Sequence, residues 1–152
     1  MTRPVQNNYP KIYLYKRIVQ AKLFIDAHFD ENINLDLIAD EAFFSKFHFV
    51  RLFKNIYGKT PHQYLILVRI ENARELLQKG VSVRETCTAV GFDSVSSFTG
   101  LFKKYNKITP SEYQKQFIER QAKIKDQPLH FIPNCFAQQY GWHEKSNFQE
   151  AG

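Results

Sequence analysis

Residues 46–54 carry basic and apolar side chains at the spacing of a single helix. Steps of three and four residues connect apolar positions 49, 52, 53 and 56, so the side chains between them are predicted to face outward: Lys46, Phe47, Val50, Arg51 and Lys54. Arginine can donate two hydrogen bonds to one guanine, and an apolar side chain can pack on the methyl group of thymine. This face therefore suits contact with duplex DNA, although Phe47 could instead cover a neighbouring helix.

The stretch that holds this face is present twice. Sliding residues 92–113 back by 49 positions lays them on residues 43–64 without a gap. The identities pair Ser94 with Ser45, Phe98 with Phe49, Phe102 with Phe53, Pro110 with Pro61 and Tyr113 with Tyr64. Two copies indicate a duplicated unit rather than a solenoid. Each copy is predicted to be a short helix, a tight turn and a longer helix with a polar, basic outer face, which is helix-turn-helix geometry.

Seven helices and no convincing strand are predicted, so the expected fold class is all-α. Apolar spacing places the first at residues 12–29, followed by helices at about 35–42 and 46–57. A long helix follows from Pro61 to near Gly80, then a short one from Ser82 to Gly91, one after Ser94, and one from Thr109 to about Lys125. Start signals support these boundaries: Asn34, Ser45 and Ser94 are candidate N-caps, and Thr60/Gln63, Ser82/Glu85 and Thr109/Glu112 are capping boxes.

The composition favours a polyanionic partner. The chain of 152 residues has a formal net charge of +6, and acidic and basic residues alternate in blocks, although ordinary surface charge would look similar. No apolar run could span a bilayer and no signal peptide is recognisable, which predicts a cytoplasmic protein. Cys87 and Cys135 are expected to be reduced thiols. The histidines lack metal-ligand spacing and there is no Gly-rich phosphate loop, so we expect no enzyme activity, metal or cofactor.

Both halves resemble the AraC/XylS-type DNA-binding domain. The second half matches the family pattern at Gly91-Phe92, Phe98, Phe102-Lys103, Thr109-Pro110 and Tyr113. The first half and the joining helix match at Leu37-Ile38-Ala39, Ser45, His48, Arg51-Leu52-Phe53-Lys54, Gly58, Tyr64-Leu65, Arg69-Ile70, Ala73 and Leu76-Leu77. The resemblance covers about residues 12–123. It implies a transcription regulator with two helix-turn-helix subdomains joined by one long helix, and family members are commonly activators that also contact RNA polymerase.

Carried over by position, the resemblance also implies a set of contacts. Bases would be contacted by Phe47, Val50, Arg51, Val95, Ser96 and Ser97, and phosphates by Lys46, Lys54, Lys103, Lys104 and Lys107. Because the copies are tandem in one chain, a monomer is expected to bind an asymmetric site across two successive major grooves.

Three positions depart from the family pattern. Thr86 would need a helix carbonyl as partner, Cys87 replaces a small residue, and Gly100 stands where arginine is frequent, so the second unit is expected to grip the backbone more than it reads bases.

The predicted organisation is a basic arm at 1–11, a first subdomain at 12–58, a linker helix at 60–79, a second subdomain at 82–125 and an irregular tail at 126–152. With about 11 residues ahead of the first helix, the DNA-binding part is expected to stand alone. The tail is rich in aromatic residues and is expected to pack on the domain or on a partner. Together with Val95 and Gly100, it leaves open an alternative: a protein-interaction module with weak or non-specific DNA binding.

Overall fold

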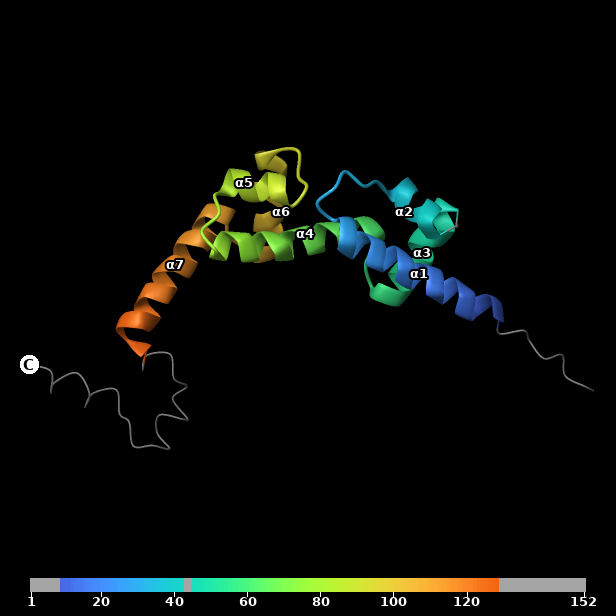
Figure 1. Ribbon diagram of the computed structural model, residues 1–152, viewed down its shortest axis with the longest axis horizontal. Coiled ribbons are helices and arrows are strands. Elements are labelled where there is room, and N and C mark those ends of the chain that lie inside the picture. The colour runs from blue at the N-terminus through green and yellow to red at the C-terminus, as the bar shows by residue number, and fades with distance from the viewer. Residues whose placement is uncertain (1–8, 43–44, 129–152) are drawn as a thin grey trace, which may run out of the picture. The chain divides into compact units, whose positions relative to one another are not determined.

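A computed structural model describes residues 9–42 and 45–128, and within them the chain forms seven α-helices and no strand (Figure 1). The helices are α1 (Tyr9–His28), α2 (Leu35–Ala42), α3 (Lys46–Tyr57), α4 (Pro61–Gln78), α5 (Val83–Ala89), α6 (Val95–Asn106) and α7 (Pro110–Asp126). Residues up to Tyr113 belong to one compact unit, and a second unit begins at Gln114, within α7. The all-α prediction is confirmed. Most of the predicted tail, like Cys135, lies outside the described residues.

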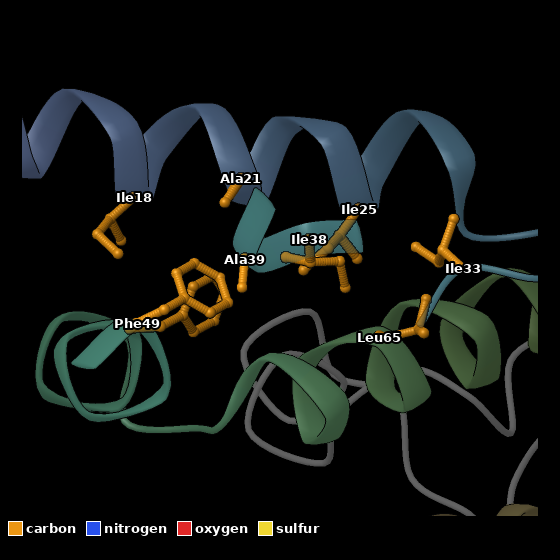
Figure 2. Packing of buried hydrophobic residues seen from close by; sticks show 9 residues of the cluster. Ile18, Ala21, Ile25, Ile33, Ile38, Ala39, Phe49 and Leu65 are labelled. Atoms are coloured by element: carbon orange, nitrogen blue, oxygen red, sulfur yellow. The ribbon is translucent and has the colours of Figure 1, made fainter. Parts of the chain in front are cut away.

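The first helix-turn-helix has its own apolar core (Figure 2). Ile18, Ala21 and Ile25 of α1 lie three and four residues apart, so they share one face and are fully buried. They pack with residues of the next three helices: Ile38, Ala39, Phe49, Phe53 and Leu65. Burial of a large apolar side chain contributes about 1.5–3 kcal/mol. This core therefore holds α3 against α1 and leaves the opposite face of α3 exposed.

The second helix-turn-helix has a separate core that α4 shares. Leu65 near the start of α4 belongs to the first core, whereas Ile70, Ala73 and Leu77 further along belong to the second. The other buried members of the second core come from α5 and α6: Cys87, Val90, Phe98 and Phe102. Cys87 is a free thiol, 2 % exposed, as the sequence predicts for this position. One helix thus joins the two cores.

The predicted helix starts are largely confirmed. In the three capping boxes the hydroxyl of Thr60, Ser82 or Thr109 accepts a backbone N–H bond, and Gln63, Glu85 or Glu112 accepts one in return. The side chain of Asn34 caps α2 as predicted. Ser45 has the extended backbone of an N-cap, but its side chain makes no capping bond. Helix α1 begins at Tyr9, three residues before the predicted start, because Pro10 is tolerated in a first helical turn.

The apolar spacing 49, 52, 53 and 56 wrongly predicts that Ile56 faces inward, and the repeat extends this wrong prediction to Tyr105, the matching position of the second copy. Ile56 is 37 % exposed and Tyr105 is 36 % exposed, although each continues the apolar stripe of its helix. Both lie in the last turn of α3 or α6, one turn beyond the buried Phe53 or Phe102. The core ends at these phenylalanines, so the stripe continues into solvent.

The hydroxyl of Thr86 also departs from expectation. Thr86 is fully buried, and within the described residues its Oγ1 has no hydrogen-bond partner, so the expected bond to a helix carbonyl is absent. A buried polar group without a partner costs about 1–3 kcal/mol. Thr86→Val keeps the shape and removes that cost, so we expect the free energy of unfolding in urea to rise by about 1 kcal/mol. Thr88→Val is the matched control, since the exposed Thr88 hydroxyl donates to the Arg84 carbonyl. A loss of stability in Thr86→Val would contradict this account.

The capping boxes at Ser82/Glu85 and Thr109/Glu112 should make the stability of the protein depend on pH in the acidic range. The hydroxyl and backbone N–H of Ser82 lower the pKa of Glu85, and the backbone N–H and hydroxyl of Thr109 lower the pKa of Glu112. A lowered carboxylate pKa stabilises the fold above the ordinary glutamate value of about 4.3, and this contribution is lost as the pH falls toward the folded-state pKa. The thermal midpoint should therefore fall more steeply below about pH 5 in the wild type than in Glu85→Gln/Glu112→Gln. Parallel curves for the two proteins would refute this prediction.

Candidate nucleic-acid interface

The outward face of α3 contains most of the predicted contact residues. Phe47 is 85 % exposed, so it does not cover any helix of the described part of the chain, and that alternative is not supported. Arg51 and Lys54 are exposed on the same helix. Val50 is half-buried and packs against the first core, so it offers only part of its surface. The face that can meet a partner is therefore formed chiefly by Phe47, Arg51 and Lys54.

Lys46 has a partner that the sequence did not reveal. Its Nζ lies 3.0 Å from Oδ1 of Asp36, which lies in the first turn of α2. Both side chains are at least half exposed, so water screens the pair and its contribution is about 0–1 kcal/mol. An approaching phosphate would compete with Asp36 for the ammonium group. Lys46 can still contact an anion, at the small cost of losing its pair with Asp36.

The N-terminal half of α6 presents small side chains. Ser94 caps the helix by accepting a hydrogen bond from the backbone N–H of Ser97, at 3.2 Å. Val95 is 42 % exposed, and Ser96 and Ser97 are exposed as well. The unoccupied N–H groups and the dipole of a helix start attract anions, so this end of α6 suits a phosphate as well as base edges.

Gly100 occupies the position in the repeat that Arg51 occupies in the first copy, 49 residues earlier. It is exposed in the middle of α6, and no atom lies within 4 Å of where its Cβ would be. The space is open, so packing does not require glycine here. The outer face of α6 therefore lacks a side chain at the position where the outer face of α3 carries Arg51.

The basic residues of the second copy lie at the C-terminal end of α6. Lys103 and Lys104 are exposed in its last turn, where cations also complement the helix dipole. Lys107 follows as the C-cap with a left-handed backbone, φ 70°, at the position that Gly58 occupies in the first copy. Its Nζ donates to the Lys104 carbonyl at 3.5 Å. The three lysines thus form one exposed basic end.

These features define a class of protein: two helix-turn-helix units on one shared helix, each with an exposed outer face on its second helix. The helix-turn-helix domain family matches residues 38–116, just over half of the chain. The chain belongs to this family, and its helix-turn-helix domain is of the AraC type.

Relatives and solved structures agree with this assignment. The chain is 34% identical over 87 residues to the probable transcription factor PqrA of Proteus vulgaris, covering 57% of this chain and 71% of that protein. It is 35% identical over 100 residues to an uncharacterised HTH-type transcriptional regulator of Pseudoalteromonas carrageenovora, covering 66% of this chain and 60% of that relative. The DNA-binding domain of AdpA, a global transcriptional factor solved in complex with a target DNA, superposes with a TM-score of 0.63 and 26% identity. That match covers 73% of this chain and 96% of that domain.

No group of three or more histidine, cysteine, aspartate or glutamate side chains in the described ranges could hold a metal ion. None of the described helices is both long and apolar enough to cross a membrane.

Gly100 allows a direct test of the second face. In an exposed helix interior, glycine is less favourable than alanine by about 1 kcal/mol. Because the added methyl group meets no atom, Gly100→Ala should raise the free energy of unfolding in urea by about 0.5–1 kcal/mol. Gly100→Arg should gain similar helix stability and also bind duplex DNA more tightly. A Gly100→Arg variant with stability raised but DNA affinity unchanged would show that α6 does not approach bases at this position.

Proposed function

We propose that the chain regulates transcription by binding an asymmetric duplex site, with α3 in one major groove and α6 in the next. The observation that carries this proposal is the pair of Phe47, 85 % exposed, and the exposed Arg51, one turn apart on α3. A phenylalanine this exposed gains about 1.5–3 kcal/mol when a partner buries it. A thymine methyl beside a guanine would satisfy both residues at adjacent base positions.

The proposed roles differ between the two helices. In α3, Phe47 and Arg51 read bases with part of Val50, and Lys46 and Lys54 contact phosphates. In α6, Val95, Ser96 and Ser97 approach the bases, while Lys103, Lys104 and Lys107 hold the backbone. Most of the sequence preference is assigned to α3, because Gly100 has no side chain to donate a hydrogen bond.

The linker length suits this arrangement. The 18 residues of α4 form a helix about 27 Å long at 1.5 Å per residue. Major grooves on one side of B-DNA recur at about 34 Å. Two reading helices on one such rod fit successive grooves of a single site, so we propose that one chain binds one site as a monomer.

The test is selection of sites from a random duplex library, followed by fluorescence anisotropy at fixed salt. We expect a preferred asymmetric site about two helical turns long, bound at least about 10³-fold more tightly than random duplex. Multi-angle light scattering of the complex should give one chain per duplex. Affinity that is equal for selected and random duplexes would reject sequence-specific regulation and favour the alternative of a protein-interaction module.

One observation favours a protein contact in addition. Helix α1 exposes Ile12, Tyr15, Val19 and Leu23, with exposed fractions between 45% and 64%, at steps of three and four along one stripe. We propose that RNA polymerase packs on this stripe, as members of the family contact it. Leu23→Glu should abolish activation in a purified transcription assay without changing DNA affinity. Gln20→Glu adds the same charge to an exposed position of α1 outside the stripe and should leave activation intact; equal activation by both variants would reject this contact.

A further inference from the structure

Arg69 lies in α4 at the junction between the two cores. It follows Leu65, which belongs to the first core, and directly precedes Ile70, which belongs to the second. Its side chain is half-buried and reaches the loop between α1 and α2. There Nε donates to the Phe29 carbonyl at 2.6 Å, and Nη2 donates to the Glu31 carbonyl at 2.8 Å. Two donors of one rigid guanidinium thus hold one loop at two points.

The same guanidinium meets the second helix-turn-helix. Its Cζ lies 5.5 Å from the ring centre of Phe92, in the turn between α5 and α6, which is within the range of cation–π attraction. Phe92 packs against the second core and against the ring of Phe98. The side chain of Arg69 therefore lies between the α1–α2 loop of the first unit and the turn that leads into α6.

The backbones of the two helix-turn-helix halves, which belong to the same compact unit, also meet directly at this place. A Cβ on Gly91 would lie 2.8 Å from the backbone oxygen of Asp30 and 3.0 Å from Nη2 of Arg69. Phe29, next to Asp30, packs against both cores. Burial lowers the pKa of Arg69, while the nearby Asp93 and Asp30 favour its charged form, and an arginine stays protonated in either case. Close backbone approach, two hydrogen bonds and a stacked ring make this a specific joint.

We propose that Arg69 is a specificity-determining residue that touches no DNA: it fixes α3 relative to α6 and thereby sets the spacing between the two half-sites that the protein accepts. The inference rests on the proposed function, in which α3 and α6 enter successive grooves. One added base pair shifts a half-site by about 3.4 Å and turns it by about a tenth of a helical turn. If Arg69 holds the two helix-turn-helix units in one arrangement, α3 and α6 cannot both move to match a half-site that is shifted and turned. Two units connected by α4 alone can adjust in this way.

The DNA test uses duplexes whose half-sites are moved apart or together by one and two base pairs. The wild type should prefer one spacing by at least about tenfold over its neighbours. Arg69→Met keeps the aliphatic volume but loses the donors and the charge, so this preference should fall to about twofold, while the preference within each half-site stays unchanged. Arg69→Lys retains the charge but cannot bind both carbonyls with one planar group. Its spacing preference should lie between those of the wild type and Arg69→Met. Arg74→Met is the matched control on the same helix, because Arg74 pairs only weakly with Glu71, at 3.9 Å, and it should keep the wild-type profile.

A second measurement does not depend on DNA. Spin labels at exposed Asn55 in α3 and exposed Thr88 in α5, in a Cys87→Ala/Cys135→Ser background, report the distance between the two units by pulsed electron resonance. We expect a narrow distance distribution with Arg69 and a clearly broader one with Arg69→Met. If the protein binds all duplexes alike, the proposed function fails while the label distances still test the joint.

Two results would overturn the proposed role of Arg69. A folded Arg69→Met protein with both the spacing preference and the narrow distance distribution of the wild type would overturn the proposal. Thermal melts establish that the variant is folded. If Arg69→Met does not fold, Arg69→Lys and Phe92→Leu, which removes the stacked ring but keeps an apolar side chain, are measured in the same way. An unchanged spacing profile in both of these variants would equally overturn it.

Discussion

Arg51→Ala should weaken binding to the preferred site by about 1–3 kcal/mol and abolish the preference at one base position. The exposed Arg51 side chain lies one turn from Phe47 on α3, and none of the described residues forms an ion pair with it. Its loss should therefore remove the proposed base contact without disturbing the fold. The measurement is anisotropy with the selected site and with every single-base variant of it, at one fixed salt concentration.

Lys104→Ala is the matched control for Arg51→Ala, because Lys104 is also exposed but is assigned to a phosphate. It should weaken all duplexes alike and lower the slope of log affinity against log salt by about one. Thermal melts of both variants should match the wild type. If Arg51→Ala lost affinity equally for every duplex, or lost none, α3 would not be the principal reading helix.

Gly91→Ala should be strongly destabilising, lowering the free energy of unfolding by about 2–5 kcal/mol. Two costs add. A left-handed backbone, φ 86°, costs an alanine about 1–2 kcal/mol, and overpacking against a rigid neighbour costs about 1–3 kcal/mol more. The neighbour here is the backbone oxygen of Asp30, 2.8 Å from the new Cβ, which cannot move aside like a flexible side chain.

Gly80→Ala isolates the first of these costs. Gly80 has nearly the same backbone angle, φ 85°, but nothing lies within 4 Å of its Cβ position. It should lose only about 1–2 kcal/mol in the same urea denaturation experiment. Equal losses at Gly80 and Gly91 would mean that the loop at Asp30 and the turn at Gly91 are not in close contact in solution.

Much of the fold could be predicted because its signals are local. A capping box spans four residues, and an apolar stripe repeats within one turn, so the helix starts at Pro61, Val83 and Pro110 follow from nearby residues alone. Where the core ends is not a local property. Ile56 and Tyr105 continue their stripes correctly but lie beyond the last residue that another helix covers. Thr86 lies within a helix as predicted, yet its hydroxyl has no hydrogen-bond partner among the described residues.

The candidate site shows the same division. The apolar stripe of α3 correctly predicted that Phe47 and Arg51 face away from the core. The repeat aligned Gly100 of the second copy with Arg51 of the first. The pair of Lys46 and Asp36 was missed, since opposite charges on separate helices give no signal until the helices pack. The assignment of bases and phosphates to individual side chains stays a prediction.

By itself, the sequence determined the seven helices of the described residues and the outward residues of α3, because each depends on residues within a few positions of one another. It also determined the duplicated unit, which is visible as identities at a fixed offset of 49 positions. Only the tertiary structure revealed which contacts hold the two helix-turn-helix units together beside the predicted linker helix. The hydrogen bonds of Arg69 reach carbonyls 40 and 38 residues away, and Gly91 lies against Asp30 across a larger separation. Such contacts leave no periodic trace in a sequence, because they depend on where two packed cores bring their loops.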